Sequence, residues 1–343
     1  MKNNSILMGG KEIKLNGINW FGMNTPTRTV HSLWQAPLDD YIAVLTKYQF
    51  NAVRLTLSAN VMLNLHKLGL KDEGAVSKNP EMAGMTVGQH LDDLVARLEK
   101  AGILVMFNLH RMNGNKDGSE ENAIDIGPLW YTEEYPEEKI IEAWVTLTKR
   151  YVNAPNVFAM DIKNEPHGAT WGDGNPKTDW RMFCQKIGNI IHEINPKVLI
   201  GCAGITSPGG RWSDSVGDAE TKPVILKLAN KVFYTPHFYI LTQTEAEMSA
   251  YLDKCVGNLA KNVGSVIVGE WGWDENDVND VKWAEQYMAY MKKAGLTNQF
   301  YWTLNENAGM NHGILVEGGV KVKEEKVAAL KTLQGEGLPI SFG

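Results

Sequence analysis

The stretch 103–109 reads ILVMFNL and is followed directly by His110 and Arg111. An unbroken apolar run of this length is typical of a strand that is buried on both faces of a sheet. Such a strand belongs to a parallel sheet whose two faces are covered by helices. The stretch therefore predicts an α/β fold, and the polar residues that follow it mark the strand's end as a place to look for function.

Comparable runs recur along the chain and alternate with helical patterns. The eight runs are GINWF (17–21), NAVRLTL (51–57), ILVMFNL (103–109), NVFAMDI (156–162), KVLIGC (197–202), KVFYTPH (231–237), SVIVGE (265–270) and NQFYWT (298–303). Apolar stripes with helical spacing lie between them, most clearly at 86–101, 136–151 and 179–194. Eight strands separated by helices predict a (β/α)8 TIM barrel, and they fit an open doubly wound sheet less well.

The domain organisation is expected to be simple. No Ser/Pro/Gly-rich linker divides the 343 residues, so we predict one catalytic (β/α)8 domain over 1–343, without a linker or carbohydrate-binding module. No GxGxxG follows the first run, which disfavours a nucleotide-binding sheet. The connections after strands are long, as at 58–85 and 111–135, and those before strands are short. This asymmetry places the site at the C-terminal ends of the strands.

Composition and charge exclude several classes of protein. The chain has 34 Lys and Arg against 40 Asp and Glu, with a net charge of −6, so we expect no nucleic-acid partner. The longest apolar run, 102–107, is too short to span a membrane. Residues 1–10 lack a sustained apolar segment, which predicts no signal peptide in this sequence. Three scattered cysteines, Cys184, Cys202 and Cys255, are read as buried thiols.

Polar and aromatic residues gather where the predicted strands end. They are Arg54, His110, Asn164, Glu165, His237, Tyr239, Glu270 and Trp302. Each has a structural interpretation when taken alone, since Arg54 could form a core ion pair and the histidines could be buried and satisfied. Burying so many polar groups without a purpose or a partner would be costly. Glu165 and Glu270 together supply the proton donor and the nucleophile or base that cleavage of a glycosidic bond requires.

Several short motifs carry a family resemblance. They are INWFG (18–22), HSLW (31–34), AVRLTLS (52–58), NLHR (108–111), LWYT (129–132), DIKNEPHGATWG (161–172), PHFY (236–239), VGEWG (268–272) and YWTLN (301–305). From about residue 16 to residue 315, the chain resembles glycoside hydrolase family 5, particularly its bacterial endo-β-1,4-glucanases. The motif NEP alone would be weak, but NEP and GEWG in this order are specific together.

The resemblance implies roles for individual residues. It makes Glu165 the acid/base and Glu270 the nucleophile. The residues that match those around the reactive sugar are Arg54, His110, Asn164, His237, Tyr239 and Trp302, and those that match aromatic platforms on the glycone side are Trp34 and Trp212. The chain departs from the family pattern at Ser32, where glycine is familiar, at Phe238, where aspartate is frequent, and at Leu304, where a second tryptophan is common. These departures bear on subsite preference.

The function expected from the sequence is a retaining endo-glycosidase that hydrolyses internal β-1,4 bonds of a cellulose-type glucan. A mixed-linkage β-glucanase, a β-mannanase, a xyloglucanase and a non-catalytic carbohydrate-binding barrel remain alternatives. We expect a β-glucan polysaccharide or oligosaccharide as substrate and a monomeric protein. Because a polymer cannot cross a membrane, export of the protein is expected on functional grounds.

Two further expectations concern metals and aromatic residues. We predict no cofactor and no catalytic metal, since the acidic run 274–280 lacks the glycine and the distal glutamate of an EF-hand and reads as a helix N-terminus. Tryptophans in the predicted strand-to-helix loops suit stacking on sugar rings, although about half are expected to be packing residues. They are Trp34, Trp130, Trp171, Trp212, Trp271 and Trp273.

Overall fold

The computed structural model describes residues 5–70, 73–114, 127–206, 214–239, 244–306, 313–333 and 340–342. Its strands are β1 Ile6–Met8, β2 Lys11–Ile13, β3 Asn16–Trp20, β4 Ala52–Ser58, β5 Leu104–Arg111, β6 Val157–Asp161, β7 Leu199–Ala203, β8 Ile205–Thr206, β9 Asp214–Ser215, β10 Val232–Thr235, β11 His237–Phe238, β12 Glu270–Trp271 and β13 Gln299–Tyr301. Its α-helices are α1 Leu38–Lys47, α2 Ala59–Leu63, α3 Val87–Lys100, α5 Glu137–Arg150, α6 Trp180–Ile194, α7 Glu245–Leu252, α8 Asn258–Asn262, α9 Val278–Ala294 and α10 Glu324–Lys331. Short 3-10 helices occupy Glu73–Val76, Pro80–Met82 and Gly217–Glu220, and one π turn occupies Asp253–Gly257.

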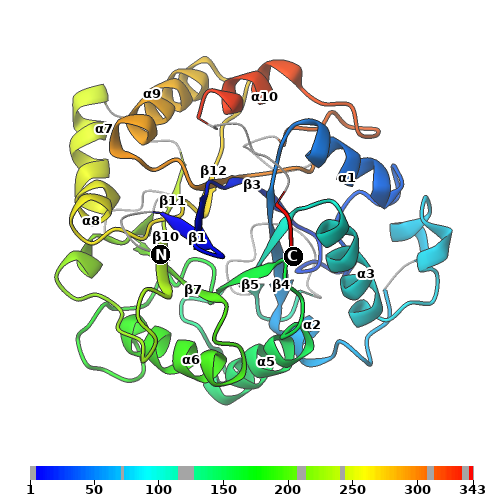
Figure 1. Cartoon of the computed structure of the whole chain (residues 1–343), viewed down its shortest axis with the longest axis horizontal. Helices are drawn as coiled ribbons and strands as arrows, with labels where there is room; N and C mark the ends of the chain where they lie inside the picture. The colour runs from blue at the N-terminus through cyan, green and yellow to red at the C-terminus, as the bar shows by residue number, and fades with distance from the viewer. Residues whose placement is uncertain are drawn as a thin grey trace.

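The central strands form a parallel sheet that closes into a barrel. Among the described residues, seven strands pair in the order β10-β7-β6-β5-β4-β3-β13. The seventh predicted run closes the ring, because Val266 bridges to Tyr234 of β10 and Val268 bridges to Gln299 of β13, both in parallel. Figure 1 shows the helices arranged around this ring of strands. The predicted (β/α)8 TIM barrel, a single α/β domain, is confirmed.

Polar side chains cap the first turns of several helices. The three predicted helical stretches correspond to α3, α5 and α6, each of which starts one residue after the predicted beginning. In α3 the first predicted residue, Thr86, is the cap and forms a capping box with Gln89. In α6 the cap is Asp179, which accepts from the backbone of Met182. Asp277 in the acidic run likewise caps α9, as the sequence predicts.

The N-terminal end of the barrel is closed by chain segments from both termini. The β1–β2 hairpin and residues 340–342 pack on the barrel interior, where the core includes Leu104, Met106 and Phe158. The backbone of Ile340 also donates to the carbonyl of Gly102. In Figure 1, β1 and the red C-terminal segment lie over the ring of strands. The opposite end of the barrel, at the C-terminal ends of the strands, is therefore the one available for a site.

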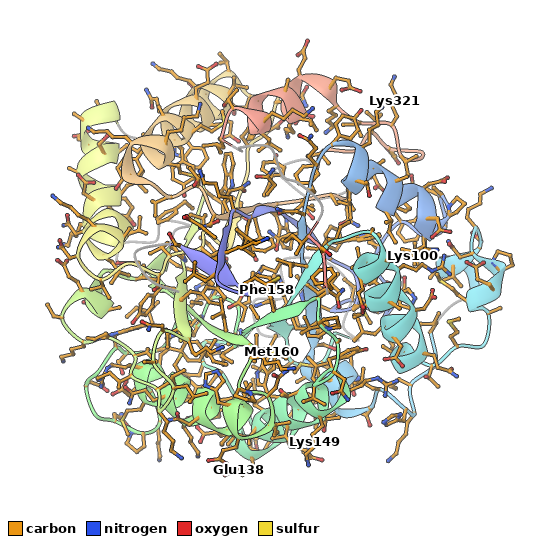
Figure 2. All side chains as sticks on the ribbon, viewed as in Figure 1. Lys100, Glu138, Lys149, Phe158, Met160 and Lys321 are labelled. Atoms are coloured by element: carbon orange, nitrogen blue, oxygen red, sulfur yellow. The ribbon has the colours of Figure 1, made fainter. Side chains whose placement is uncertain are left out.

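The side chains divide between interior and periphery as expected for a barrel. Figure 2 places Phe158 and Met160 of β6 toward the middle of the molecule. The α5 residues Glu138 and Lys149 lie at the lower edge of the same view, and Lys100 lies at α3. In the part of the chain that the structure describes, no helix combines the length and the apolar character needed to cross a membrane.

Candidate active site

Arg54 on β4 is the centre of the polar residues at the barrel mouth. Its side chain is fully buried. Nε donates to Asp161 Oδ2 at 2.8 Å, and Nη1 donates to Glu270 Oε1 at 2.5 Å and to Asn19 Oδ1 at 2.9 Å. Nη2 donates to Asn164 Oδ1 at 3.1 Å. Burial alone would lower the pKa of this guanidinium, but the charges of Asp161 and Glu270 raise it, so Arg54 stays cationic.

A polar layer beneath Arg54 fixes its partners. Asp161 at the end of β6 accepts from Asn108 Nδ2 at 3.0 Å and from Thr235 Oγ1 at 3.3 Å as well as from Arg54. Asn19 on β3 donates to the carbonyl of Gly269 at 3.0 Å. These contacts join strands that are far apart in the sequence. They hold the guanidinium in one orientation beneath the site, which is the preorganisation that a catalytic carboxylate needs.

Glu270, the first residue of β12, is held between two donors. Arg54 donates to its Oε1, and Tyr239 donates from its hydroxyl to Oε2 at 2.9 Å. The side chain of Glu270 is 5% exposed. Burial and the charges of Glu270 and Glu165 raise the pKa of the Tyr239 hydroxyl well above 10, so Tyr239 remains a neutral donor. This carboxylate is thus fixed in place with both oxygens hydrogen-bonded.

Glu165 follows β6 in a strained conformation. Its φ is 45°, a left-handed backbone that residues other than glycine rarely adopt and that persists mainly at functional sites. Oε1 lies 3.0 Å from His237 Nδ1, and Oε2 lies 3.4 Å from His167 Nε2. Burial raises the pKa of this carboxyl, but the hydrogen bonds from His167 and His237 outweigh burial and hold the pKa well below its usual value. In the free protein Glu165 is therefore ionised.

His237 on β11 lies between three carboxyl groups. Its Nδ1 is 3.0 Å from Glu165 Oε1, 3.6 Å from Glu270 Oε2 and 3.6 Å from Asp214 Oδ2. Burial would lower the pKa of the imidazole, but the charge of Glu270, the hydrogen bond to Glu165 and the charge of Asp214 raise it to about 9. A side chain at Gly269 would come within 2.9 Å of His237 Nε2, so the motif needs glycine before Glu270.

His110 and Asn164 offer polar atoms with defined roles. Asn108 donates from Nδ2 to Asp161, so its Oδ1 accepts, and His110 must donate to it from Nδ1 at 2.9 Å. Burial and the nearby charges of Arg54 and Arg111 hold the pKa of His110 well below its usual value. Its imidazole is therefore neutral, with Nε2 as an acceptor. Asn164 accepts from Arg54 through Oδ1, which leaves its amide nitrogen as a donor.

A row of aromatic rings leads away from the carboxylates. His110 stacks on Trp302 with ring centroids 5.5 Å apart, and Trp302 stacks on Phe21 at 5.8 Å. Phe21 contacts His31 at 4.9 Å, and His31 contacts Trp34 edge-on at 4.5 Å. Phe21, Trp34 and Trp302 are half-buried. Trp34 is thus connected to the carboxylate pair through this row rather than by direct contact.

The loop that carries Trp34 is fastened at Ser32. This residue has a φ of 75°, which explains why glycine is familiar at this position in the family. Its Oγ lies 2.9 Å from both carboxylate oxygens of Glu306, and Gln35 Nε2 lies 2.5 Å from Glu306 Oε1. The serine therefore brings a hydrogen-bond partner that offsets part of the backbone strain.

Four of the loop tryptophans are buried in the structure. Trp130 and Trp271 are fully buried, and Trp273 and Trp171 are 4% and 7% exposed. Trp130 stacks on Phe183 of α6, and Trp271 packs on Tyr301 of β13. These four are packing residues, which fits the expectation that about half of the tryptophans pack rather than stack on sugar rings. Trp212 lies outside the described residues.

Three residues of the site were missed in the sequence. Asp161 and His167 belong to the motif DIKNEPHGATWG, and their position beside Glu165 was a usable signal. Asp214 at the start of β9 comes close to Glu165 and His237 only through the fold. Burial and the charge of Glu165 raise the pKa of the Asp214 carboxyl well above its usual value. No sequence signal distinguishes this aspartate from those in other loops.

A TIM barrel with two carboxylates at its mouth and half-buried aromatic rings beside them defines a class of protein, the glycoside hydrolases. The comparisons with known proteins agree. The model of the cellulase family, glycosyl hydrolase family 5, matches residues 9–308. This chain belongs to that family and is a glycoside hydrolase.

Bacterial and archaeal enzymes are among the similar proteins. An endoglucanase of Paenibacillus polymyxa is 34% identical over 90% of this chain and 79% of its own length. The major extracellular endoglucanase of Xanthomonas campestris pv. campestris is 30% identical over 95% and 69%. The solved catalytic domain of the major endoglucanase from that bacterium superposes with a TM-score of 0.87, 29% identity, and coverage of 97% of this chain and 98% of that one. An endocellulase from Pyrococcus horikoshii in complex with cellotetraose gives a TM-score of 0.83 and 29% identity over 94% and 93%.

Proposed function

We propose that this protein is a retaining endo-β-1,4-glucanase in which Glu270 is the nucleophile and Glu165 the acid/base. The observation that carries the proposal is that both carboxylates approach one ring nitrogen, His237 Nδ1, at 3.0 and 3.6 Å. Their nearest oxygens can then be no farther apart than these two distances combined. This limit favours the spacing of about 5–5.5 Å in retaining enzymes over the wider spacing that leaves room for a water molecule.

The proposed reaction has two displacements. Glu270 attacks the anomeric carbon while Glu165 gives its proton to the leaving glycosidic oxygen, so that one C–O bond forms and another breaks. Glu165 then takes a proton from water, which attacks the anomeric carbon and releases Glu270. Because Glu165 is ionised in the free protein, we assign the proton for the first step to the Glu165–His237 pair, in which His237 carries it at rest.

The remaining polar residues have positioning roles in this proposal. Arg54 and Tyr239 orient Glu270 through their hydrogen bonds to its two oxygens. His110 Nε2 accepts from a sugar hydroxyl, and the amide nitrogen of Asn164 donates to one. The half-buried rings of Trp302 and Trp34 provide apolar faces for glucosyl rings, and the family resemblance assigns the same role to Trp212.

The glucan substrate is supported by the relatives. Two of them are named endoglucanases, and a similar endocellulase was solved with cellotetraose. We extend to this chain the expectation of a β-1,4-glucan over a mannan, a mixed-linkage glucan or a xyloglucan. The Xanthomonas relative is described as extracellular, which supports secretion. We further propose that the catalytic unit acts as a monomer and a single domain.

Proton NMR of the first sugar anomer released from cellohexaose tests the mechanism. We expect the β anomer at once and the α anomer only through later mutarotation, because double displacement retains configuration. Mass spectrometry after treatment with a 2-fluoro cellobiosyl donor should find the label on Glu270. Glu270→Gln is the matched control and should take up no label. An initial α product, or a label on another residue, would refute the mechanism.

A further inference from the structure

A third carboxyl group faces the proposed catalytic pair. Asp214 in β9 is 3% exposed, and its Oδ2 lies 3.6 Å from His237 Nδ1. Among the described residues, this oxygen has no hydrogen-bond partner. A buried carboxyl oxygen without a donor is costly unless a proton or a cation occupies the place beside it. The proposed reaction does not use Asp214, so its presence needs another explanation.

Three side chains from separate segments converge at this point. A carboxylate oxygen of Glu165, a carboxylate oxygen of Asp214 and a ring nitrogen of His237 all lie within 4.8 Å of one another. Ligands at ordinary zinc bond lengths in a tetrahedron are separated by about 3.3–3.5 Å. His237 Nδ1 lies 3.0 Å from Glu165 Oε1 and 3.6 Å from Asp214 Oδ2. One distance is slightly shorter and the other slightly longer than the separation of two zinc ligands. The oxygens of Glu165 and Asp214 lie within 4.8 Å of each other, so side-chain shifts of at most about 1.5 Å would complete three corners of a tetrahedron.

We propose that Glu165, Asp214 and His237 form an inhibitory zinc site at the barrel mouth. Zn²⁺ takes Nδ1 of His237 in place of the proton now directed at Glu165 and binds Asp214 as the carboxylate, so that the protons these two groups hold are released to solvent. One oxygen each from Glu165 and Asp214 completes the protein ligands, and water fills the fourth position. The side chain of Glu165 is 16% exposed, against 4% for Asp214 and 1% for His237, so the ion enters from the side of Glu165.

The three ligand atoms of this site favour Zn²⁺ over other divalent cations. One nitrogen and two carboxylate oxygens suit Zn²⁺, whereas Ca²⁺ needs six to eight oxygen ligands and Mg²⁺ prefers an octahedron of oxygens with several waters. Inhibition follows if Glu165 is the acid/base, and this part of the inference rests on the proposed function. The aromatic row that ends at Trp34 does not contribute ligands, so zinc should lower kcat with little change in KM.

The direct test measures zinc binding without activity. Wild-type protein competes for ZnSO4 with a chelating dye, and Asp214→Asn and Asp214→Ser are compared with it. Each Asp214 variant should bind zinc at least about tenfold more weakly, since a ligand is lost. The matched control is Asp218→Asn, which removes the same charge from an exposed position four residues away and should bind as wild type does. Glu270→Gln should also retain zinc, which separates this test from failure of the proposed reaction.

Two further measurements identify the zinc ligands and the effect of zinc on activity. X-ray absorption of the zinc complex should show nitrogen and oxygen ligands; sulfur ligands would place the ion on the buried cysteines and overturn the proposal. With a soluble glucan, zinc should reduce kcat of wild type and of Asp218→Asn, whereas equal concentrations of MgSO4 should not. Equal zinc affinity in wild type and the Asp214 variants, or no binding by wild type, would also overturn the proposal.

Discussion

One ring nitrogen, His237 Nδ1, lies 3.0 Å from Glu165 and 3.6 Å from Glu270. The pair formed by Glu165 and His237 therefore shares a proton within reach of both carboxylates. Because the pKa of His237 is raised to about 9, the pair keeps this proton at neutral pH although Glu165 itself is ionised. The proton supply of the proposed acid/base is thus governed by the histidine.

The first prediction is a pH profile. The basic limb of kcat/KM should fall near pH 9, where His237 loses its proton and Glu165 can no longer receive one. In His237→Gln the basic limb should move to lower pH, since only the Glu165 carboxyl can then hold the proton. His167→Gln is the control and should keep its limb near 9. Identical profiles in wild type and His237→Gln would show that the pair does not share the proton.

The second prediction concerns the leaving group. Glu165→Ala should lower kcat on cellohexaose by about 10²- to 10⁴-fold, the usual contribution of general acid catalysis. On an aryl cellobioside whose leaving group needs no proton, the first step should be nearly unaffected, as stopped-flow release of the phenol will measure. Equal losses on both substrates would remove Glu165 from the role of acid.

The third prediction compares two arginines. Arg54→Gln leaves Asp161 and Glu270 buried without their cation, so the free energy of unfolding should fall by about 3–5 kcal/mol. Arg97, which is 26% exposed and pairs with Asp39 and Asp93, serves as the control. Arg97→Gln should cost about 0–1 kcal/mol. Urea denaturation measures both, and similar losses would contradict the importance of burial.

The fourth prediction uses chain length. Trp34→Ala should lower kcat/KM on cellohexaose by about 10- to 100-fold if a stacked glucosyl ring is worth about 1–3 kcal/mol, by analogy with base stacking. The loss on an aryl cellobioside, too short to reach Trp34, should be much smaller. Mannohexaose and mixed-linkage glucan complete the panel. A preference for mannan, or no loss on long glucans, would leave only the broader glycosidase function.

The fifth prediction is acid sensitivity from a structural histidine. His90 on α3 is fully buried, and burial lowers its pKa from 6.5 to about 4. Between pH 6.5 and pH 4, His90 is protonated in the unfolded chain but stays neutral in the folded protein. The free energy of unfolding therefore falls as the pH drops through this range, by about 3 kcal/mol in all. His90→Gln should flatten this part of the stability curve. Urea midpoints between pH 4 and pH 7 provide the measurement.

Much of the fold was predictable because buried strands leave a strong local pattern. All eight predicted runs lie in the barrel wall, and the run 265–270 is the least regular, with pairing through Val266 and Val268 before β12 begins. The family motifs also indicated the residues around Glu165 and Glu270. The structural and the functional interpretation of Arg54 both hold, since the side chain forms a core ion pair with Asp161 and also contacts Glu270 at the site.

The parts of the site that could not be predicted depend on loop conformation. Asp214 lies far from Glu165 in the sequence, and no periodicity governs a loop residue, so its position beside His237 could not be anticipated. For a related reason, the sequence could not show which of the loop tryptophans are packing residues. Trp130 lies in a predicted strand-to-helix loop and Trp271 follows a predicted strand, but neighbours such as Phe183 and Tyr301 enclose them. Exposure is a property of tertiary packing, which a single sequence does not encode locally.

The contact between Ser32 and Glu306 constrains how the sequence of the loop that carries Trp34 can evolve. With φ at 75°, the serine is tolerable while Glu306 accepts its hydroxyl. Replacement of Glu306 alone would leave Ser32 in a strained backbone conformation without this hydrogen bond. Replacement of Ser32 by glycine alone would leave the Glu306 carboxylate with one fewer donor. The two positions should therefore be epistatic, and neutral drift through them should proceed by paired replacement.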